Sequence, residues 1–256
     1  MNFVNNTLPP KLQSGFTLIE LSLGVLLSAF LITGMVKIVS AASGSFRLQD
    51  NQSEVMENGR YAIATISKSI RSAGFSPEPW NPAFTRDGLM PGTVDRISSR
   101  SDRLILRSWS DTNCYDHQNP VRDENGRPAF HIRESLFDLN SVGDLAHTCR
   151  YGPDDAELIT QINHNGFVRN AESFQALYGE DINGDGLVDG WVKGSEWADA
   201  NQVLAVRIGL LLKSSDPVVE KMTQSFGVLD HTHQGRADGR LRQLFVFTSV
   251  IRGNER

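Results

Sequence analysis

The sequence predicts an α+β protein in which one long N-terminal helix, membrane-spanning in its first half, packs on an antiparallel β-sheet domain. Three observations lead to this prediction. The 21 residues Phe16–Val36 are apolar or small and contain one charged side chain, that of Glu20. Apolar positions then continue at helical spacing to about residue 74. Beyond that point the chain breaks into short strand-like runs that are separated by loops rich in Gly, Asn and Asp.

The composition is that of a folded protein. The 256 residues are 39% hydrophobic and 21% charged, with 22 Gly and 10 Pro, which excludes a fibrous or low-complexity chain. The net charge of −5 and the pI near 5.7 argue against a general nucleic-acid binder, because such a protein would carry a basic surface. No nucleic-acid partner is therefore expected.

The apolar run is long enough to cross a membrane. At about 1.5 Å per residue, a helix of this length just spans a hydrocarbon core of about 30 Å. Residues 1–15 contain Lys11 and no acid, which favours a cytoplasmic position for this end. A cleaved secretory signal is the alternative, since Ser40-Ala41-Ala42 resembles the small-residue site of a signal peptidase.

The helical pattern continues past that alternative cleavage site, which favours one helix of some 55 residues. Its apolar positions after the span are Met35, Ile38, Val39, Ala42, Phe46, Met56, Ile63, Ile66, Ile70 and Ala73. We therefore expect four segments: 1–15 before the span, 16–37 as the membrane-spanning half-helix, 38–74 as an amphipathic half-helix, and 75–256 as a β-rich globular domain.

The β-rich domain begins after a proline-containing loop, residues 76–82, which cannot continue the helix. The expected strands are Arg103–Trp109, Leu158–Ile162, Glu172–Tyr178, Val203–Leu212 and Leu241–Ile251. Val206, Ile208 and Leu210 alternate along the fourth run, as a half-buried strand requires. Loops of this kind favour an antiparallel sheet, which would bury its apolar face on the second half of the helix.

The N-terminal residues resemble a known processing signal. Gly15-Phe16-Thr17-Leu18-Ile19-Glu20 is similar to the signal of type IV prepilins, and other stretches are similar to minor pilins of the PilW family. Those stretches are Glu57–Tyr61, Ile70–Phe75, Leu177–Gly179, Val203–Leu212 and Arg240–Arg252. The resemblance implies a type IV pilin-like fold.

It also implies processing and a location. A prepilin peptidase would remove residues 1–15 as a leader by cutting after Gly15, and would methylate the new amine of Phe16. The chain would be a single-pass protein of the bacterial inner membrane with a periplasmic C-terminus, and would then enter a pilus at the cell surface. Its partners would be other minor pilins and the major pilin. It would act in priming assembly or in the tip complex, and hence in twitching motility and adhesion.

The resemblance assigns an assembly role to Glu20. A carboxylate at the centre of a bilayer costs roughly 2.5–3.5 kcal/mol on insertion scales, so it needs a partner. In a filament the carboxylate would pair with the terminal amine of a neighbouring subunit and fix the axial register. The alternative is a lone acid whose side chain reaches the membrane interface.

Two other functions share this architecture. One is a minor pseudopilin of the J type in type II secretion, and the other is a tip adhesin, since surface loops bind ligands without recognisable motifs. An enzyme is not expected, because the sequence lacks G-x-S-x-G, H-E-x-x-H and the phosphate loop G-x₄-G-K-[ST].

Cys114 and Cys149 are the two cysteines, and both fall in the part expected to face the oxidising periplasm. An even count fits one disulfide, which would close a loop of about 36 residues and contribute up to about 4 kcal/mol. The span between them looks too polar to hold itself together. Two unpaired buried thiols are the alternative.

One loop has the start of a calcium-binding pattern. Asp181, Asn183 and Asp185 occupy positions 1, 3 and 5 of D-x-N-x-D-G, with a glycine at position 6. Leu187 would offer its carbonyl and Asp189 its carboxylate, so Ca²⁺ is the expected cofactor. The bidentate glutamate of an EF-hand is missing at position 12, where Glu196 or Asp199 could substitute. A simple β-turn is the alternative.

Two further groups carry weaker signals. His231 and His233 could share a strand face, but we expect a solvated loop there rather than a metal site. The four tryptophans are expected to anchor the core or loops rather than form a ligand box; they are Trp80, Trp109, Trp191 and Trp197.

Overall fold

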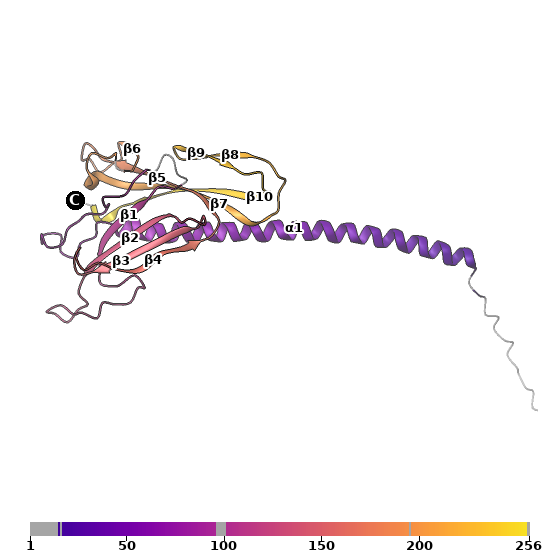
Figure 1. Cartoon of the computed structure of the whole chain (residues 1–256), viewed down its shortest axis with the longest axis horizontal. Coiled ribbons are helices and arrows are strands. Elements are labelled where there is room, and N and C mark those ends of the chain that lie inside the picture. The colour runs from indigo at the N-terminus through magenta and orange to yellow at the C-terminus, as the bar shows by residue number, and fades with distance from the viewer. Residues whose placement is uncertain (1–14, 16, 96–100, 195, 255–256) are drawn as a thin grey trace, which may run out of the picture. The chain divides into compact units, whose positions relative to one another are not determined.

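The computed structural model describes residues 15, 17–95, 101–194 and 196–254, and it confirms the predicted α+β architecture of a long helix and antiparallel sheets (Figure 1). The elements in chain order are α1 (Leu18–Ser72), β1 (Leu104–Ser110), β2 (His131–Leu139), β3 (Leu145–Gly152), β4 (Ile159–Val168), β5 (Ala171–Glu180), β6 (Gly190–Val192), the 3₁₀ turn η1 (Ala200–Gln202), β7 (Val203–Pro217), β8 (Gln224–Val228), β9 (His231–Gly235), β10 (Arg240–Val250) and the 3₁₀ turn η2 (Arg252–Asn254).

The chain divides into two compact units, residues 1–47 and 48–256, and α1 contributes to both. In the first unit every described residue is exposed. This part of α1 is long and apolar enough to cross a membrane, judged by length and composition. Residues 38–47, expected to be amphipathic, bury no side chain in the described chain.

The second unit contains the hydrophobic core. The helix residues buried there recur every three or four positions, as one helical stripe requires: Asn51, Val55, Gly59, Ala62, Ile66, Ser67 and Ile70. Ile66 and Ile70 were predicted to lie on this face, and both are fully buried. The core cluster extends from Val55 to Ile251 and combines residues of α1, of both four-stranded sheets and of the adjoining loops, so residues 48–256 hold the whole of it.

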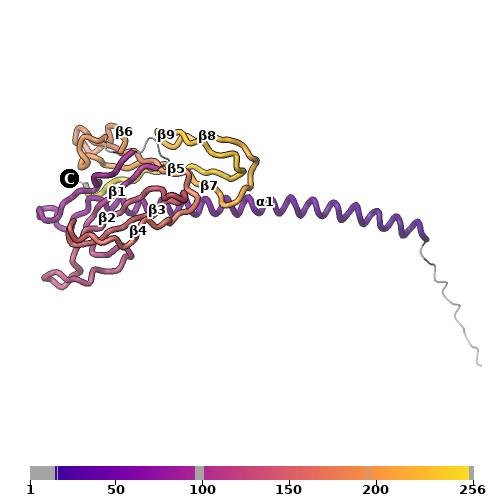
Figure 2. Tube along the Cα trace, viewed as in Figure 1, coloured from indigo at the N-terminus to yellow at the C-terminus, as the bar shows by residue number. Residues whose placement is uncertain are grey.

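Two four-stranded antiparallel sheets surround this stripe. The first has the order β1-β2-β3-β4 and the second the order β10-β7-β5-β6, while β8 and β9 form a separate hairpin. In Figure 2 the strands of the first sheet follow one another along the chain, whereas β10 returns to lie beside β7. The Asp102 N–H donates to the Phe174 carbonyl at 2.8 Å, which connects the segment before β1 to β5 of the second sheet.

Five predicted strands are confirmed, and five observed strands (β2, β3, β6, β8 and β9) were not expected. The predicted runs fall in β1, β4, β5, β7 and β10. β2 crosses the polar span between the two cysteines, where no strand was predicted, and it is held by pairing with β1 and β3. The expectation of a solvated loop at His231 and His233 is also wrong, because both lie in β9 and the His233 side chain is buried.

Two glycines in the stretches that resemble PilW proteins are required by close packing or by the backbone conformation. Gly59 lies under the ring of Phe245, so that a Cβ at this position would come within 2.2 Å of the ring. Gly74 ends the helix region with φ +72°, a conformation that favours glycine, and its N–H donates to the Arg107 carbonyl. A Cβ on Gly253 would lie 2.1 Å from the Gly74 backbone. These contacts hold the end of α1 against the C-terminal segment.

Candidate assembly and binding sites

The start of α1 is closed by a capping box that contains Glu20. The Glu20 N–H donates to the Thr17 hydroxyl at 3.3 Å, while the Glu20 carboxylate accepts from the Thr17 N–H at 3.0 Å and from its hydroxyl at 2.8 Å. The carboxylate satisfies free donors at the helix N-terminus, where a negative charge is also favoured by the helix dipole. Sequence reasoning missed this role, although the spacing T-x-x-E is its signature.

The residues of the predicted processing signal lie on either side of this cap. Gly15 is exposed, and a Cβ added at this position would have no atom within 4 Å, so the backbone here is open. Phe16 lies outside the described residues. Across the described chain Glu20 has no ion-pair partner, and its side-chain hydrogen bonds are the local ones to Thr17.

The apolar surface of α1 begins immediately after the cap. Its large side chains are more than half exposed in this single chain: Leu18, Ile19, Leu21, Leu23, Val25, Leu26, Leu27, Phe30, Leu31, Ile32, Met35, Val36, Ile38 and Val39. An apolar surface of this extent is not stable in water, so it marks contact with a membrane or with other apolar helices.

The loop 181–189 is organised by its own carboxylates. Asp181 accepts hydrogen bonds from the N–H groups of Gly184, Asp185 and Gly186 at 2.7–3.1 Å. Asp189 accepts from the N–H groups of Ile182 and Asn183 at 2.8 and 3.2 Å. Gly184 and Gly186 both have positive φ, which fits the sharp turns of the predicted pattern.

The oxygens expected to bind calcium are only partly brought together. The Asn183 side-chain amide donates to Asp185 at 3.2 Å and to Asp189 at 3.1 Å, so these three side chains meet at one point. Asp185 also accepts from the Leu187 N–H at 2.8 Å. Within the described residues no group of three or more His, Cys, Asp or Glu side chains is arranged to hold a metal ion. Calcium binding stays a prediction.

The two cysteines form the predicted disulfide, with a Cα–Cα distance of 5.9 Å. Cys149 lies in β3, and Cys114 lies in the loop before β2. Tyr151 is buried beside the bridge, and Ile162 packs against it. The Cys114 N–H donates to the Gln161 side chain at 2.9 Å, and the Tyr115 hydroxyl donates to the Gln161 carbonyl at 2.6 Å. The bridge therefore ties the exposed loop of residues 111–130 to the first sheet.

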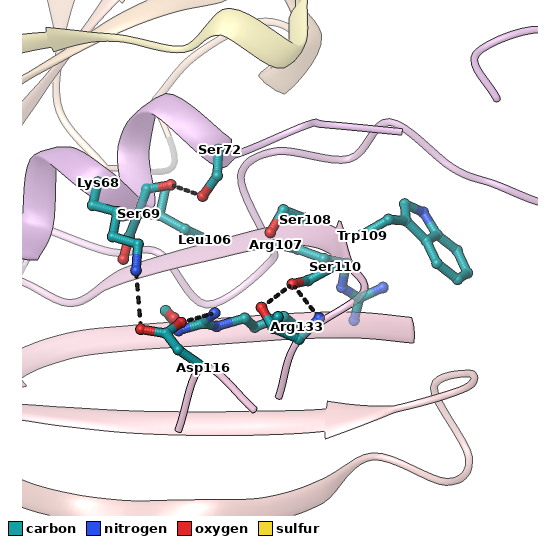
Figure 3. Close-up of a pocket in the computed structure, with 12 residues that line it drawn as sticks. Lys68, Ser69, Ser72, Leu106, Arg107, Ser108, Trp109, Ser110, Asp116 and Arg133 are labelled. Carbon is teal, nitrogen blue, oxygen red and sulfur yellow. Dashed lines mark hydrogen bonds and ion pairs between the residues drawn. The ribbon is translucent and has the colours of Figure 1, made fainter. Parts of the chain in front are cut away.

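A surface pocket lies between the end of α1 and strands β1 and β2 (Figure 3). Asp116 bridges Lys68 at 3.1 Å and Arg133 at 2.9 Å across its mouth. Hydrogen bonds and the two positive charges outweigh desolvation and lower the pKa of Asp116. The lining also contains the serines Ser69, Ser72, Ser108, Ser110 and Ser135.

Buried ion pairs fix the two sheets. In the first sheet, Glu134 of β2 accepts from Arg107 at 3.1 Å and from Arg150 at 2.9 Å. In the second, Glu172 of β5 accepts from Arg242 at 2.6 Å and from Lys213 at 3.1 Å. Burial alone would raise the pKa of Glu172, but these hydrogen bonds and charges outweigh burial and lower it. Sequence reasoning did not anticipate either cluster.

Comparisons with known proteins agree with the sequence resemblance. The family model of type IV pilus-assembly protein W (PilW) matches residues 149–253, and this match confirms the predicted likeness to PilW proteins over that range. The matched residues include β4, β5, β7 and β10 as well as the loop 181–189.

Among solved structures, the chain is similar to a type IV-like pilin, TTHA1219, from Thermus thermophilus. The identity is 14% and the TM-score 0.49, and the alignment covers 78% of this chain and 97% of that one. No curated protein matches the chain.

Proposed function

We propose that the chain is a minor pilin that primes assembly of a type IV pilus or joins its tip complex. One observation carries this proposal: a fully exposed apolar helix, with an acid at its start, continues into a unit whose residues 149–253 match the PilW family model. In an isolated soluble chain this apolar surface would be exposed to water. In an assembled filament it would pack against the apolar helices of other subunits.

The proposal assigns two successive surroundings to the apolar helix. Before assembly the inner membrane covers it, and the second unit stands in the periplasm, where its disulfide forms. In the filament the same surface packs against the apolar helices of the major pilin and of other minor pilins. Transfer between two apolar surroundings changes the buried apolar area little, so the acid near its start can decide the register.

Processing by prepilin peptidase is the first step and the first test. We expect a mature chain that begins at N-methylated Phe16, because the cleavage site follows Gly15. Its net side-chain charge would be −6, since the removed segment carries Lys11 and no acid, leaving 24 basic and 30 acidic residues. Intact-mass analysis of pilus-associated protein measures both properties. A mature chain that starts near Ser43 would instead indicate a secretory signal and contradict the proposal.

The assembly role of Glu20 needs a variant that separates it from helix capping. Glu20→Ala should leave membrane insertion intact, because a desolvation cost disappears, and should reduce recovery in sheared pili at native expression. Thr17→Val is the matched control, because it breaks the capping box and keeps the carboxylate. We expect Thr17→Val to assemble nearly normally. An equal loss in both variants would assign Glu20 to the cap alone.

A genetic test separates the pilus from the alternatives. Loss of the gene should abolish piliation and twitching motility while type II secretion continues. Loss of secretion with normal pili would indicate a J-type pseudopilin. Normal piliation with lost adhesion would indicate a tip adhesin. The acidic net charge gives no support to nucleic-acid capture.

A further inference from the structure

The polar pocket between the end of α1 and strands β1 and β2 borders the apolar core (Figure 3). Side chains alternate along β1, so Ser108 lies on the same face as Leu106, which is buried in the core. The register of the two strands places Arg133 opposite Ser108, and Ser135 lies two residues further along the same face of β2. With Lys68 of α1, these side chains line a cavity of about 200 Å³.

This pocket contains more hydrogen-bond donors than its own acceptors use. A guanidinium has five N–H groups and an ammonium has three. Within the described residues Arg133 uses one of them and Lys68 one, both toward the carboxylate of Asp116, at 2.9 and 3.1 Å. The Ser135 side chain has no hydrogen bond in this part of the chain, although the residue is only 6% exposed. Leaving a buried hydroxyl unpaired costs free energy, so an acceptor inside the cavity would stabilise the site.

The charge that faces the cavity is positive. The ammonium and the guanidinium outnumber the single carboxylate of the lining, that of Asp116. Arg107 also lines the pocket, but its side chain points to the other face of β1, where Glu134 and Asp155 pair with it at 3.1 and 2.6 Å. An excess of positive charge, together with unused donors, favours a ligand that is anionic and rich in acceptor oxygens.

The donors reach the cavity from several directions. In Figure 3 Lys68 extends from α1, Ser108 from β1 and Arg133 from β2. The oxygens of phosphate or sulfate point to the corners of a tetrahedron, so such an anion can accept hydrogen bonds from all three elements at once. A planar carboxylate offers fewer directions: in the described chain, that of Asp116 bonds to the two cations and leaves the Ser108 and Ser135 hydroxyls unpaired.

We propose that this pocket binds a tetrahedral oxyanion, such as phosphate, between Lys68, Arg133 and the unpaired Ser135 hydroxyl. The Asp116 carboxylate competes with the anion for the two cations. Residues 111–130 hold this carboxylate in place, because the disulfide ties their loop to the first sheet. A bound anion would connect the end of α1 to β2. The site is independent of the proposed pilin function, since it uses neither residues 1–15 nor the apolar part of α1.

The test titrates inorganic phosphate into the full chain in detergent and follows the heat of binding. The ionic strength is held constant with chloride, because screening alone would weaken any surface attraction. We expect one saturable site in the millimolar range or below, sulfate binding at the same site, and no heat from additional chloride. Glycerol 3-phosphate tests the source of the anion: tighter binding than phosphate would assign the site to a phosphorylated molecule, and equal or weaker binding to free phosphate.

Single substitutions should change the affinity in opposite directions. Lys68→Gln should weaken phosphate binding roughly tenfold, because it removes a charge-assisted hydrogen bond. Ser135→Ala should weaken it roughly fivefold, since a neutral hydrogen bond is lost. Asp116→Asn should strengthen it roughly tenfold, because the competing charge disappears. Arg236→Gln is the control: Arg236 is exposed and lies outside the pocket, so this variant should bind as the wild type does.

A neighbouring histidine reports where the anion lies. Burial is the larger cause of the lowered pKa of His147, and the charge of Arg133 lowers it further. A bound anion offsets that charge, so saturating sulfate, which keeps its charge in mild acid, should raise the pKa of His147. Nuclear magnetic resonance of the ring protons measures this pKa. At the same sulfate concentration Lys68→Gln should show a smaller rise, and an unchanged pKa in the wild type would place the anion away from Arg133.

Three results of the titrations would overturn the proposal. Phosphate heats that never saturate, or that equal those of chloride, would show that the pocket binds no anion. Unchanged binding in Lys68→Gln, with the melting curve of the wild type, would place the anion elsewhere. Weaker binding in Asp116→Asn would contradict the competition between this carboxylate and the anion. None of these measurements involves filaments, so failure of the pilus tests would leave them interpretable.

Discussion

The two parts of helix α1 bury their side chains in opposite ways. Up to Arg47 every described residue is exposed, whereas from Asn51 onward one residue in three or four is buried against the sheets. The first part exposes large apolar side chains over residues 18–39, and the second is apolar along one stripe. One continuous helix therefore serves two kinds of contact. The partners of its first part lie outside the chain, and those of its second part lie within it.

The same substitution in the two parts should have very different effects. Ile66 is fully buried and Ile32 is 61% exposed. Ile66→Ala should lower the free energy of unfolding of the second unit by about 2–5 kcal/mol, because it leaves a cavity in the core. Ile32→Ala should leave it unchanged within about 0.5 kcal/mol. Urea unfolding followed by tyrosine and tryptophan signals measures both. Similar effects in both variants would contradict the division of α1 into two parts.

Removing the disulfide should affect only the second unit. Cys114→Ser with Cys149→Ser opens a loop whose ends are 35 residues apart, which costs up to about 4 kcal/mol in the chain-entropy model. Membrane insertion of the first part should not change, since both cysteines lie in the other unit. Urea unfolding of the double variant and fractionation of membranes check the two statements. If the double variant were as stable as the wild type, the disulfide would contribute little to the free energy of unfolding.

A partly buried histidine should make the second unit sensitive to mild acid. His147 stacks on Phe137 at 4.7 Å, and burial, aided by the charge of Arg133, lowers its pKa from 6.5 to about 4. Between pH 6.5 and about pH 4, the unfolded chain therefore binds a proton at this histidine, whereas the folded chain does not. Stability is complete above pH 6.5 and falls by at most about 3 kcal/mol as the pH drops toward 4.

His147→Phe should flatten this pH dependence, since the ring stays apolar and cannot charge. Unfolding by urea at several pH values between 4 and 7 gives the slope. His117→Phe is the control, because His117 is exposed. An unchanged slope in His147→Phe would assign the acid sensitivity to other groups. The carboxylate of Glu172 should contribute only below about pH 4.5, because its pKa is lowered.

The contact of Gly59 with Phe245 should make an otherwise helpful substitution harmful. Alanine in place of glycine favours a helix by about 1 kcal/mol, but overpacking against the ring costs roughly 1–3 kcal/mol. Gly59→Ala should therefore lower the stability of the second unit by about 1 kcal/mol, and Phe245→Leu should partly restore it. Gly44→Ala, where no atom lies within 4 Å, should have no effect on this unit. Thermal melts of the three variants measure these changes in the stability of the second unit.

Calcium should give the smallest effect. Without a bidentate acid at position 12, the loop 181–189 should have a dissociation constant of roughly 10⁻⁴–10⁻³ M. At ten times that constant, binding adds about 1.4 kcal/mol and raises the melting temperature by about 2–4 °C. Magnesium should do less, because it dehydrates reluctantly. The measurement is a melt of residues 48–256, which contain the whole core, in calcium, magnesium or chelator.

Asp185→Ala should erase the calcium shift. The control is Asp123→Ala, because Asp123 also accepts backbone hydrogen bonds in an exposed turn, from Asn125 at 2.9 Å and Arg127 at 2.8 Å, but lacks the calcium pattern. The control variant should keep the shift. Identical melting temperatures in calcium and in chelator would show that the loop 181–189 is a simple turn that does not bind calcium.

The sequence was informative where apolar residues repeat regularly. The helix, β5, β7 and β10 could be predicted because their buried positions are hydrophobic and follow a helix or strand period. Strands β2 and β3 could not, since buried positions such as Glu134 are charged and are satisfied only by arginines of neighbouring strands. A single sequence does not show which charges will meet.

The candidate sites differ in the same way. The disulfide could be predicted from two cysteines and a compartment, and the capping of Glu20 by Thr17 could have been read from a four-residue spacing. The stacking of Arg207 on Trp191 could not be predicted, because it depends on the pairing of β5 with β6 and β7.

The long separation of the core contacts has a consequence for the rate of folding. Glu54 and Asn51 of α1 bond to Ser215 and Asp216, which lie 161 and 165 residues away in the sequence. Domains dominated by such distant contacts fold in milliseconds to seconds, because the large loops must close before the contacts form. The apolar stripe of the second half of α1 therefore stays exposed to solvent until the strands that follow it in the sequence pack against it. In that interval an anchored first half would keep newly made chains apart.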